Sequence, residues 1–364
     1  MSAHIITVEQ IRHSLDTWYQ LMLKQDFVQS KLLKEEIDSK INHIEEDQNI
    51  WFYYSLLNFR HKVLIDSMNI SYDEFDKVDS LSIPNDAHLT YYYHLFKGIH
   101  LMFISNYNDS KKHFEQAEGL LKYMSNPIEQ AEFNYRIAYF YYQSHEPLLS
   151  INYVRAAKEE YIKHIGYEVN VALCNNIYGM SCLDLQQYEQ AEENFTLALD
   201  VFKKSGIERF ILMVRHNLGW LYANQNLSSS AIRHLLEVTR DNPNHFKAIF
   251  VLAREHYKLG ETNIAAELIE EGLNICNKLK NKEFQQRFMI LKEMNKNVSG
   301  VLLEPVILEG ISYFEKEGLW DCVQEYSEIL ALQFYKEEND SKASKYFYIN
   351  NQAQKKYLEK GALK

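Results

Sequence analysis

The segment "IYGMSCLDLQQYEQAEENFTLALDVF", residues 177–202, carries the clearest structural signal in this chain of 364 residues. Small residues punctuate it at fixed intervals: Gly179, then Ala191 twelve positions later, then Ala198 seven positions after that. Two antiparallel helices joined by a tight turn approach closely only where a small side chain lies at their crossing. The segment therefore predicts a packed helix pair, with Gly179 on the first helix and both alanines on the second.

The same triplet recurs in register before and after this segment. The corresponding positions are Gly98–Ser110–Ala117, Ala138–Ser150–Ala157, Gly219–Ala231–Val238 and Ala253–Ala265–Gly272. Such an array of helix–turn–helix units, each about 34 residues or slightly longer, is typical of tetratricopeptide repeats. Two looser pairs follow towards the C-terminus, so we expect about seven units between residues 88 and 358.

The first 85 residues do not follow this register. Three segments there carry apolar residues at helical spacing, at roughly 8–25, 27–46 and 49–68. The acidic stretch that follows contains Pro84 and indicates an irregular connection. We therefore predict an all-α protein with three parts: an N-terminal three-helix bundle in residues 1–70, a linker in 71–87, and a right-handed tetratricopeptide-repeat superhelix in 88–364.

Composition narrows the class of protein. The chain has 46% hydrophobic and 24% charged residues with only 12 Gly and 5 Pro, which favours a folded helical protein. Its net charge of −11 repels phosphate backbones, so we expect no nucleic-acid partner.

Cysteine usage and hydropathy indicate where the protein works. The four cysteines are widely spaced without a C-x-x-C pattern, so we expect reduced, buried thiols and no metal site. Neither a signal peptide nor an apolar run near the roughly 18 residues of a membrane span is evident. These features predict a soluble, cytoplasmic protein with no membrane partner.

Several segments together resemble a known family. "DTWYQLM" (16–22), "EEDQNIWFYYSLLNFRH" (45–61), "LDLQQYEQAEENF" (183–195) and "YFEKEGLW" (313–320) are similar to segments of the Rap family, the quorum-sensing regulators of spore-forming bacilli. The resemblance implies a cytoplasmic protein whose bundle binds the receiver domain of a phosphorylated response regulator. It also implies inhibition by a secreted and re-imported Phr-type pentapeptide, held in the groove of the repeats.

The polar tip before the third helix is the candidate catalytic site. Hydrolysis of an aspartyl phosphate needs a water held in line with the phosphorus, and an amide can donate to and accept from that water. Gln48 matches the family's catalytic glutamine, and Glu45, Glu46 and Asp47 are candidates for docking the receiver. A structural interpretation stays open, in which the tip is a solvated turn and Asp47 caps the third helix. We expect no cofactor of its own, since the divalent metal belongs to the receiver.

The groove should be lined by the first helix of each pair. Asn217 matches the family's peptide-clamping asparagine, and Asp184 matches an acid that pairs with a cationic peptide side chain. Alternatively, Asn217 packs within the array, Asp184 is a solvated carboxylate at a helix end, and the larger apolar side chains belong to the core. The full set of candidate peptide-binding residues is Asn176, Met180, Asp184, His216, Asn217, Trp220 and Asn224.

Three functions are compared with the sequence features. The leading one is a peptide-inhibited aspartyl-phosphate phosphatase that acts on a response regulator. The second is non-enzymatic sequestration of a DNA-binding, competence-type response regulator, also controlled by peptide. The third, a DNA-binding peptide sensor, needs a basic recognition helix, and residues 49–63 are too aromatic and too weakly charged for that. No nucleotide-binding, serine-hydrolase or H-E-x-x-H motif is present.

Overall fold

The computed structural model describes residues 7–41 and 47–361, and within these ranges the chain is helical without strands. The helices are α1 (Val8–Leu23), α2 (Phe27–Ile41), α3 (Gln48–Asp66), α4 (Asp76–Asp79), α5 (Ala87–Phe103), α6 (Tyr107–Leu120), α7 (Pro127–Gln143), α8 (Pro147–Tyr161), α9 (Glu168–Asp184), α10 (Tyr188–Lys204), α11 (Glu208–Asn224), α12 (Ser228–Asp241), α13 (Phe246–Lys258), α14 (Thr262–Leu279), α15 (Lys282–Asn295), α16 (Gly300–Glu317), α17 (Trp320–Lys336) and α18 (Asp340–Gly361). Among the described residues, the short 3-10 helices Ser67–Asn69 and Leu121–Tyr123 follow α3 and α6.

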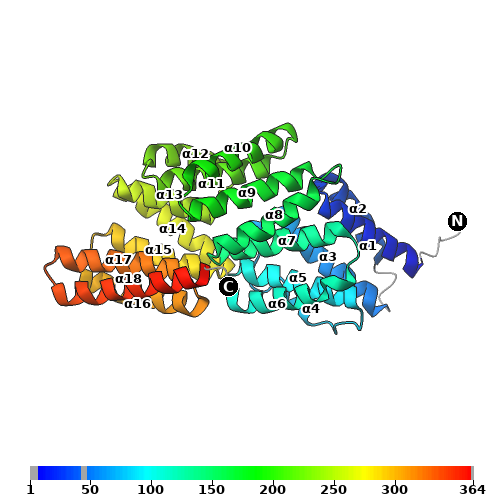
Figure 1. Ribbon diagram of the computed structural model, residues 1–364, viewed down its shortest axis with the longest axis horizontal. Helices are drawn as coiled ribbons and strands as arrows, with labels where there is room; N and C mark the ends of the chain where they lie inside the picture. The colour runs from blue at the N-terminus through cyan, green and yellow to red at the C-terminus, as the bar shows by residue number, and fades with distance from the viewer. Residues whose placement is uncertain (1–6, 42–46, 362–364) are drawn as a thin grey trace.

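From α5 onward the helices pack in successive antiparallel pairs, α5 with α6 through α17 with α18. Figure 1 shows the pairs stacked into a curved array with α1–α3 at one end. This arrangement confirms the predicted all-α fold and its right-handed repeat superhelix of about seven units. None of the described helices is long and apolar enough to cross a membrane.

Small residues do lie at the helix crossings. A Cβ atom placed on Gly179 would lie 2.8 Å from the Phe195 ring, and one on Gly219 would lie 2.7 Å from the Leu235 side chain. Carbon atoms in good contact are about 3.5–4.0 Å apart, so any larger residue would push the paired helices apart. The small-residue register is therefore set by the distance between the two helices of a pair.

The turn inside each pair has a recurring conformation. One residue takes a left-handed backbone with φ between 52° and 76°, which ends the first helix and reverses the chain. Only one of these positions is glycine, so sequence alone does not mark the turn. The turn residues are Ser105, His145, Gln186, Asn226, Gly260, Asn297 and Glu338.

The N-terminal bundle differs slightly from expectation at its helix ends. Helix α1 ends at Leu23 because Gln25 adopts φ 59°, and α3 begins at Gln48, one residue earlier than predicted. Residues 42–46, which were expected to end the second helix, lie outside the described residues. The 71–87 segment contains α4, and Phe75 directly before this helix is fully buried with its ring centroid 4.8 Å from that of Phe59 on α3.

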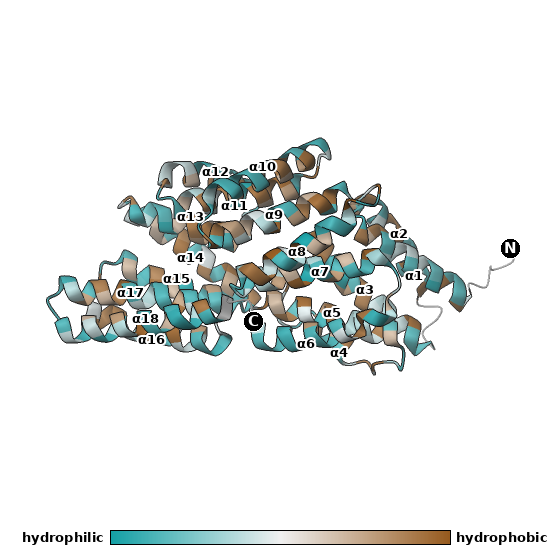
Figure 2. Cartoon of the chain, viewed as in Figure 1, coloured by the Kyte–Doolittle hydropathy of each residue, from teal (hydrophilic) through white to brown (hydrophobic). Residues whose placement is uncertain are grey.

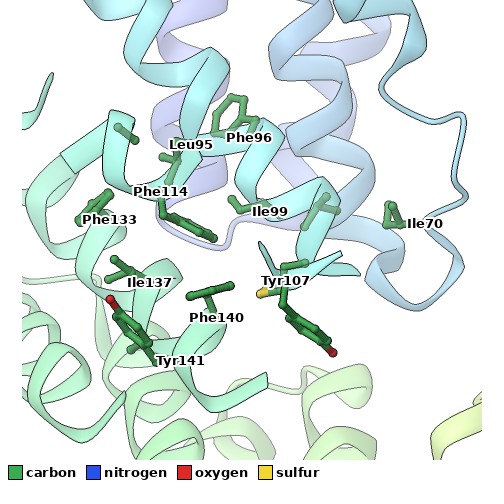
Figure 3. Packing of buried hydrophobic residues seen from close by; sticks show 14 of the residues in the cluster. Ile70, Leu95, Phe96, Ile99, Tyr107, Phe114, Phe133, Ile137, Phe140 and Tyr141 are labelled. Atoms are coloured by element: carbon green, nitrogen blue, oxygen red, sulfur yellow. The ribbon is translucent and has the colours of Figure 1, made fainter. Parts of the chain in front are cut away.

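The bundle and the array share a hydrophobic core. One cluster of buried side chains runs from α1–α3 through α5–α9 and continues into α15–α18. Figure 3 shows part of it, where Phe114 of α6 packs against Phe140 of α7 with ring centroids 5.2 Å apart. Figure 2 shows apolar and polar residues sharing most helices, as expected for helices with one face in a core. The bundle therefore packs continuously against the first repeats.

The superhelix closes on itself. The hydroxyl of Tyr107, on α6, donates to Glu283 of α15 at 2.8 Å, and Asn108 donates to the carbonyl of Lys316 at 2.7 Å. Tyr313 donates to the carbonyl of Ser105 at 3.2 Å. Helix α18 also contacts α8, and Figure 1 shows its end turning back towards α7 and α8. The first repeat is thus in direct contact with the sixth, and the second repeat with the last.

Candidate functional site

The polar tip lies at the start of α3. The Asp47 carboxylate caps this helix, since its Oδ1 accepts from the backbone N–H groups of Asn49 at 3.0 Å and Ile50 at 3.1 Å. Gln48, the first residue of the helix, is exposed. Asp47 therefore has the structural role that was considered for it, while the Gln48 amide faces solvent. The predicted docking residues Glu45 and Glu46 lie outside the described residues.

Aromatic side chains join the three bundle helices behind the tip. The hydroxyl of Tyr54, on α3, donates to Asp38 of α2 at 2.8 Å, and that of Tyr53 donates to Asp16 of α1 at 3.1 Å. Trp18 is fully buried, and its ring centroid lies 6.3 Å from that of Tyr54. These contacts join all three helices directly behind Gln48, so the bundle presents the amide from a fixed support.

A buried ionic network joins the bundle to the repeats. Arg60 of α3 donates to Glu132 of α7 at 3.1 Å, and Arg136 donates to the same carboxylate at 2.7 Å. Burial alone would raise the pKa of Glu132, but the guanidinium groups of Arg136 and Arg60 lower it below its ordinary value. The carboxylate is therefore charged, and it is the shared counter-ion of two buried cations.

A second buried carboxyl lies one helical turn away. Glu129 of α7 accepts hydrogen bonds from the hydroxyls of Tyr19 on α1, at 3.1 Å, and Tyr92 on α5, at 3.0 Å. Burial raises the pKa of Glu129 to about 7, although the two tyrosines lower it. The protonation of this one residue therefore affects the contact between bundle and array.

Two of the predicted groove residues form a pair. Asn217 of α11 donates through Nδ2 to Oδ1 of Asn176 on α9 at 2.6 Å, and both side chains are more than nine-tenths buried. The pair places two amides side by side on the inner helices of successive repeats. Asn217 therefore forms a hydrogen bond within the array. This agrees with the interpretation of Asn217 as a packing residue of the repeats.

The other predicted groove residues spread along the inner helices. Met180 is buried, whereas Trp220 is half-buried beneath the guanidinium of Arg254, whose Cζ lies 4.8 Å from the ring centroid. The rings of His216 and His245 lie 4.7 Å apart, and burial lowers the pKa of His216 well below its ordinary value. His216 is therefore neutral.

Asp184 lies at the far end of α9, about 12 Å along the helix from Asn176 at 1.5 Å per residue. Its Oδ2 is 3.9 Å from Nδ1 of His145, and its side chain is 13% exposed. Burial raises the pKa of this carboxyl well above its ordinary value, and the nearby Asp321 raises it further. Asp184 is therefore not simply a solvated carboxylate at a helix end.

A cavity of about 270 Å³ opens beside Asn224 in the later repeats. Its charged lining residues are Arg254, Lys258 and Glu325, the first two on α13 and the third on α17. Sequence reasoning missed these residues, although the repeat register contained a signal for two of them. In the repeat register, Arg254 takes the position of Trp220, and Lys258 takes the position of Asn224. The fifth repeat therefore has two cations where the fourth has an indole and an amide.

The bundle also touches the groove directly. Phe27, at the start of α2, packs against Phe210 near the start of α11, with ring centroids 5.7 Å apart. The guanidinium of Arg209 stacks on the same Phe27 ring, with Cζ 3.7 Å from its centroid. Helix α11 also carries Asn217, so one rigid element links the predicted peptide site to the helix that precedes the tip.

Comparison with known proteins supports this architecture. The family model described as response regulator aspartate phosphatase H, N terminal, matches residues 5–66. The chain is 26% identical over 374 residues to response regulator aspartate phosphatase I of Bacillus subtilis strain 168, covering 98% of this chain and 94% of that protein. It is also 26% identical over 360 residues to the regulatory protein RapF of the same strain, covering 94% of each. A solved structure of a Rap protein complexed with competence and sporulation factor has a TM-score of 0.80 at 22% identity, covering 97% of this chain and 99% of that one.

Proposed function

We propose that this chain, which is a Rap family protein, binds the receiver domain of a phosphorylated response regulator through its N-terminal bundle and promotes hydrolysis of the aspartyl phosphate. The observation that carries the proposal is the exposed Gln48 amide on the first turn of α3, supported by part-buried hydrogen bonds that join α3 to α1 and α2. The sequence similarity to response regulator aspartate phosphatase I supports the same assignment.

For hydrolysis of the aspartyl phosphate, the protein needs mainly to position the attacking water. An aspartyl phosphate is a reactive acyl phosphate, and the receiver supplies its own divalent metal. A carboxamide that accepts one hydrogen of a water and donates to its oxygen holds that water in line with the phosphorus. In this proposal Gln48 holds the water, and the acidic residues beside it contribute to docking.

We further propose that a signalling peptide in the groove inhibits this activity in the cytoplasm. A Rap protein of the same fold has been solved with competence and sporulation factor, and the Asn176–Asn217 pair offers amides suited to an extended backbone. Peptide binding at α11 can affect the bundle because Phe210 and Arg209 of that helix pack against Phe27 of α2. If the peptide favours the closed array with the bundle as it stands here, and the receiver favours another placement of the bundle as a unit, each ligand weakens the other by the same coupling energy.

The proposal is tested by measuring the lifetime of the phosphoryl group on candidate receivers with and without the protein. Gln48→Ala and Gln48→Asn are the variants, since an exposed first-turn residue can change with little effect on stability. A displacement of about 1 Å at a reacting group costs up to about 100-fold in rate, so Gln48→Asn should lose most of the acceleration while receiver binding is retained. The matched control is Gln29→Asn, an exposed amide near the start of α2. Full acceleration by Gln48→Ala would refute the catalytic assignment.

A second function is supported by a specific observation. Asp47 is committed to capping α3, which is the structural interpretation of the tip, and the similar protein RapF is named a regulatory protein. In this alternative the bundle sequesters a DNA-binding response regulator without chemistry. Tight receiver binding with an unchanged phosphoryl lifetime, in every receiver tested, would favour it over hydrolysis.

A further inference from the structure

Side chains of the metal-ligand type converge where the superhelix closes. His145 comes from the turn between α7 and α8, Asp184 from the end of α9, and Asp321 and Cys322 from the first turn of α17. The second, third and last repeats therefore meet at one point. Asp184 was considered for peptide binding, whereas the other three residues have no part in the proposed function.

Three of the four ligand atoms lie near the spacing of a tetrahedral site, and the carboxylate of Asp184 lies beside them. His145 Nδ1 lies 3.2 Å from Asp321 Oδ2 and 3.9 Å from Asp184 Oδ2, and Cys322 Sγ lies 3.6 Å from Asp321 Oδ2. Metal–ligand distances of about 2.0–2.3 Å in a tetrahedral zinc site place neighbouring ligand atoms roughly 3.3–3.8 Å apart. The ligand atoms of His145, Asp321 and Cys322 all lie within 4.8 Å of one another, so these three residues form the core of the site.

The local charge also points to a bound cation. Asp184 Oδ2 and Asp321 Oδ1 are buried atoms without a hydrogen-bond partner among the described residues. Two neighbouring carboxylates that are mostly buried are costly unless a cation compensates them. The nearest fixed cation, Arg287 of α15, is already committed to Glu283 at 3.1 Å and to Cys322 Sγ at 2.9 Å.

The charges of the cluster favour a divalent cation over a monovalent one. Two carboxylates and a thiolate carry three negative charges, and the positive charge of Arg287 is already paired with Glu283. A divalent ion compensates two of the three ligand charges, and binding releases the thiol proton to solvent. A mixed set of imidazole, thiolate and carboxylate ligands suits zinc better than calcium or magnesium, which prefer oxygen ligands alone.

We propose that His145, Asp184, Asp321 and Cys322 bind one zinc ion, which ties the second and third repeats to the last and stabilises the closed superhelix. The site does not follow a sequence motif because its ligands lie in separate repeats, up to 177 positions apart. It differs from the expectation of no metal site, which rested on the lack of closely spaced ligands.

The test uses the full chain alone, freed of metal with a chelator and then titrated with zinc. We expect one zinc bound per chain. Loss of an outer-shell partner typically weakens metal binding about 10–100-fold, so loss of a ligand in Asp321→Asn or Cys322→Ser should weaken it by at least about tenfold. The matched control is Cys276→Ser. It removes a different fully buried thiol, on α14, and should leave the affinity for zinc unchanged. Far-UV circular dichroism checks that each variant is folded.

Cobalt gives a second readout that does not depend on affinity. Cobalt bound by the protein should show a sulfur-to-metal charge-transfer absorption that is kept in Cys276→Ser and lost in Cys322→Ser. Absence of stoichiometric zinc binding, or zinc binding untouched by both Asp321→Asn and Cys322→Ser, would overturn the proposal. Peptide binding that weakens in Asp321→Asn without any zinc binding would also overturn it, and would assign the carboxylates to a cationic peptide side chain. Neither receiver nor peptide enters the metal titration, so its failure is distinguishable from failure of the proposed function.

Discussion

Replacing Glu132 by glutamine should loosen the bundle from the repeat array. This carboxylate is fully buried on α7, accepts from Arg60 and Arg136, and also accepts from the hydroxyl of Tyr161 at 3.2 Å. Glutamine keeps the volume and most of the hydrogen-bonding capacity of the side chain. What it removes is the one negative charge that two buried guanidinium groups share.

The cost follows from the charges left behind. Removing one partner of a buried ion pair destabilises a protein by about 3–5 kcal/mol, because the remaining charge stays buried without compensation. Here two cations lose their common counter-ion, while the neighbouring Glu129 has its pKa raised to about 7 and compensates only in part. We therefore expect a loss of about 3–5 kcal/mol in the free energy of unfolding of the part that contains α1–α8. Typical stabilities of about 5–15 kcal/mol make that a large fraction of the whole.

Urea unfolding followed by tryptophan fluorescence and by hydrogen exchange measures this loss. Trp18 and Trp51 report on the bundle, whereas Trp220 and Trp320 lie in the array. The matched control is Glu118→Gln, an exposed carboxylate on α6 that also accepts from a tyrosine, and it should change stability by less than about 0.5 kcal/mol. Equal stability of the two variants would refute the reasoning that Glu132 neutralises the junction.

Two further predictions concern the groove and the pH dependence. Asn217→Ala removes an amide able to make two hydrogen bonds to a peptide backbone, so the peptide concentration for half-inhibition should rise about 10–100-fold. Asn194→Ala, which removes a half-buried amide on the outer helix α10, is its control, and equal inhibition of both variants would exclude Asn217 from the groove. Folding raises the pKa of Glu129 from 4.5 to about 7, so the folded state holds this proton more tightly than the unfolded state. The contribution of Glu129 to the free energy of unfolding is therefore complete below about pH 4.5 and is lost as the pH rises through 7. That loss amounts to about 3 kcal/mol. Urea titrations from about pH 5 to pH 8 should show this decline in the parent and a flatter profile in Glu129→Gln; parallel profiles would contradict it.

Local signals in the sequence were sufficient to predict the helical repeats. The spacing of Gly179, Ala191 and Ala198 reflects a contact between neighbouring helices, so it is visible within one 26-residue segment. The acidic tip was likewise visible, because Asp47 caps α3 through residues two and three positions away. Contacts of this range depend on local geometry alone.

Closure of the superhelix could not be predicted in the same way. Tyr107 and Glu283 are 176 positions apart, and their meeting depends on small rotations that accumulate over every intervening repeat. The metal-ligand cluster and the bundle–array junction have the same origin, since Arg60 and Glu132 meet only after both parts have folded. Arg254 is different, because extending the repeat register by one unit would have found it.

The most direct test of the central claim is to ask whether the tip reaches the receiver's phosphorylated centre. Gln48→Cys introduces an exposed thiol for a spin label, whereas the native cysteines are buried and burial raises the pKa of Cys182 to about 11 and of Cys276 to about 12. With an isotope-labelled receiver activated by beryllofluoride, the label should broaden the NMR signals around the phosphorylated aspartate. Broadening confined to another face of the receiver, in a complex of undiminished affinity, would contradict the account.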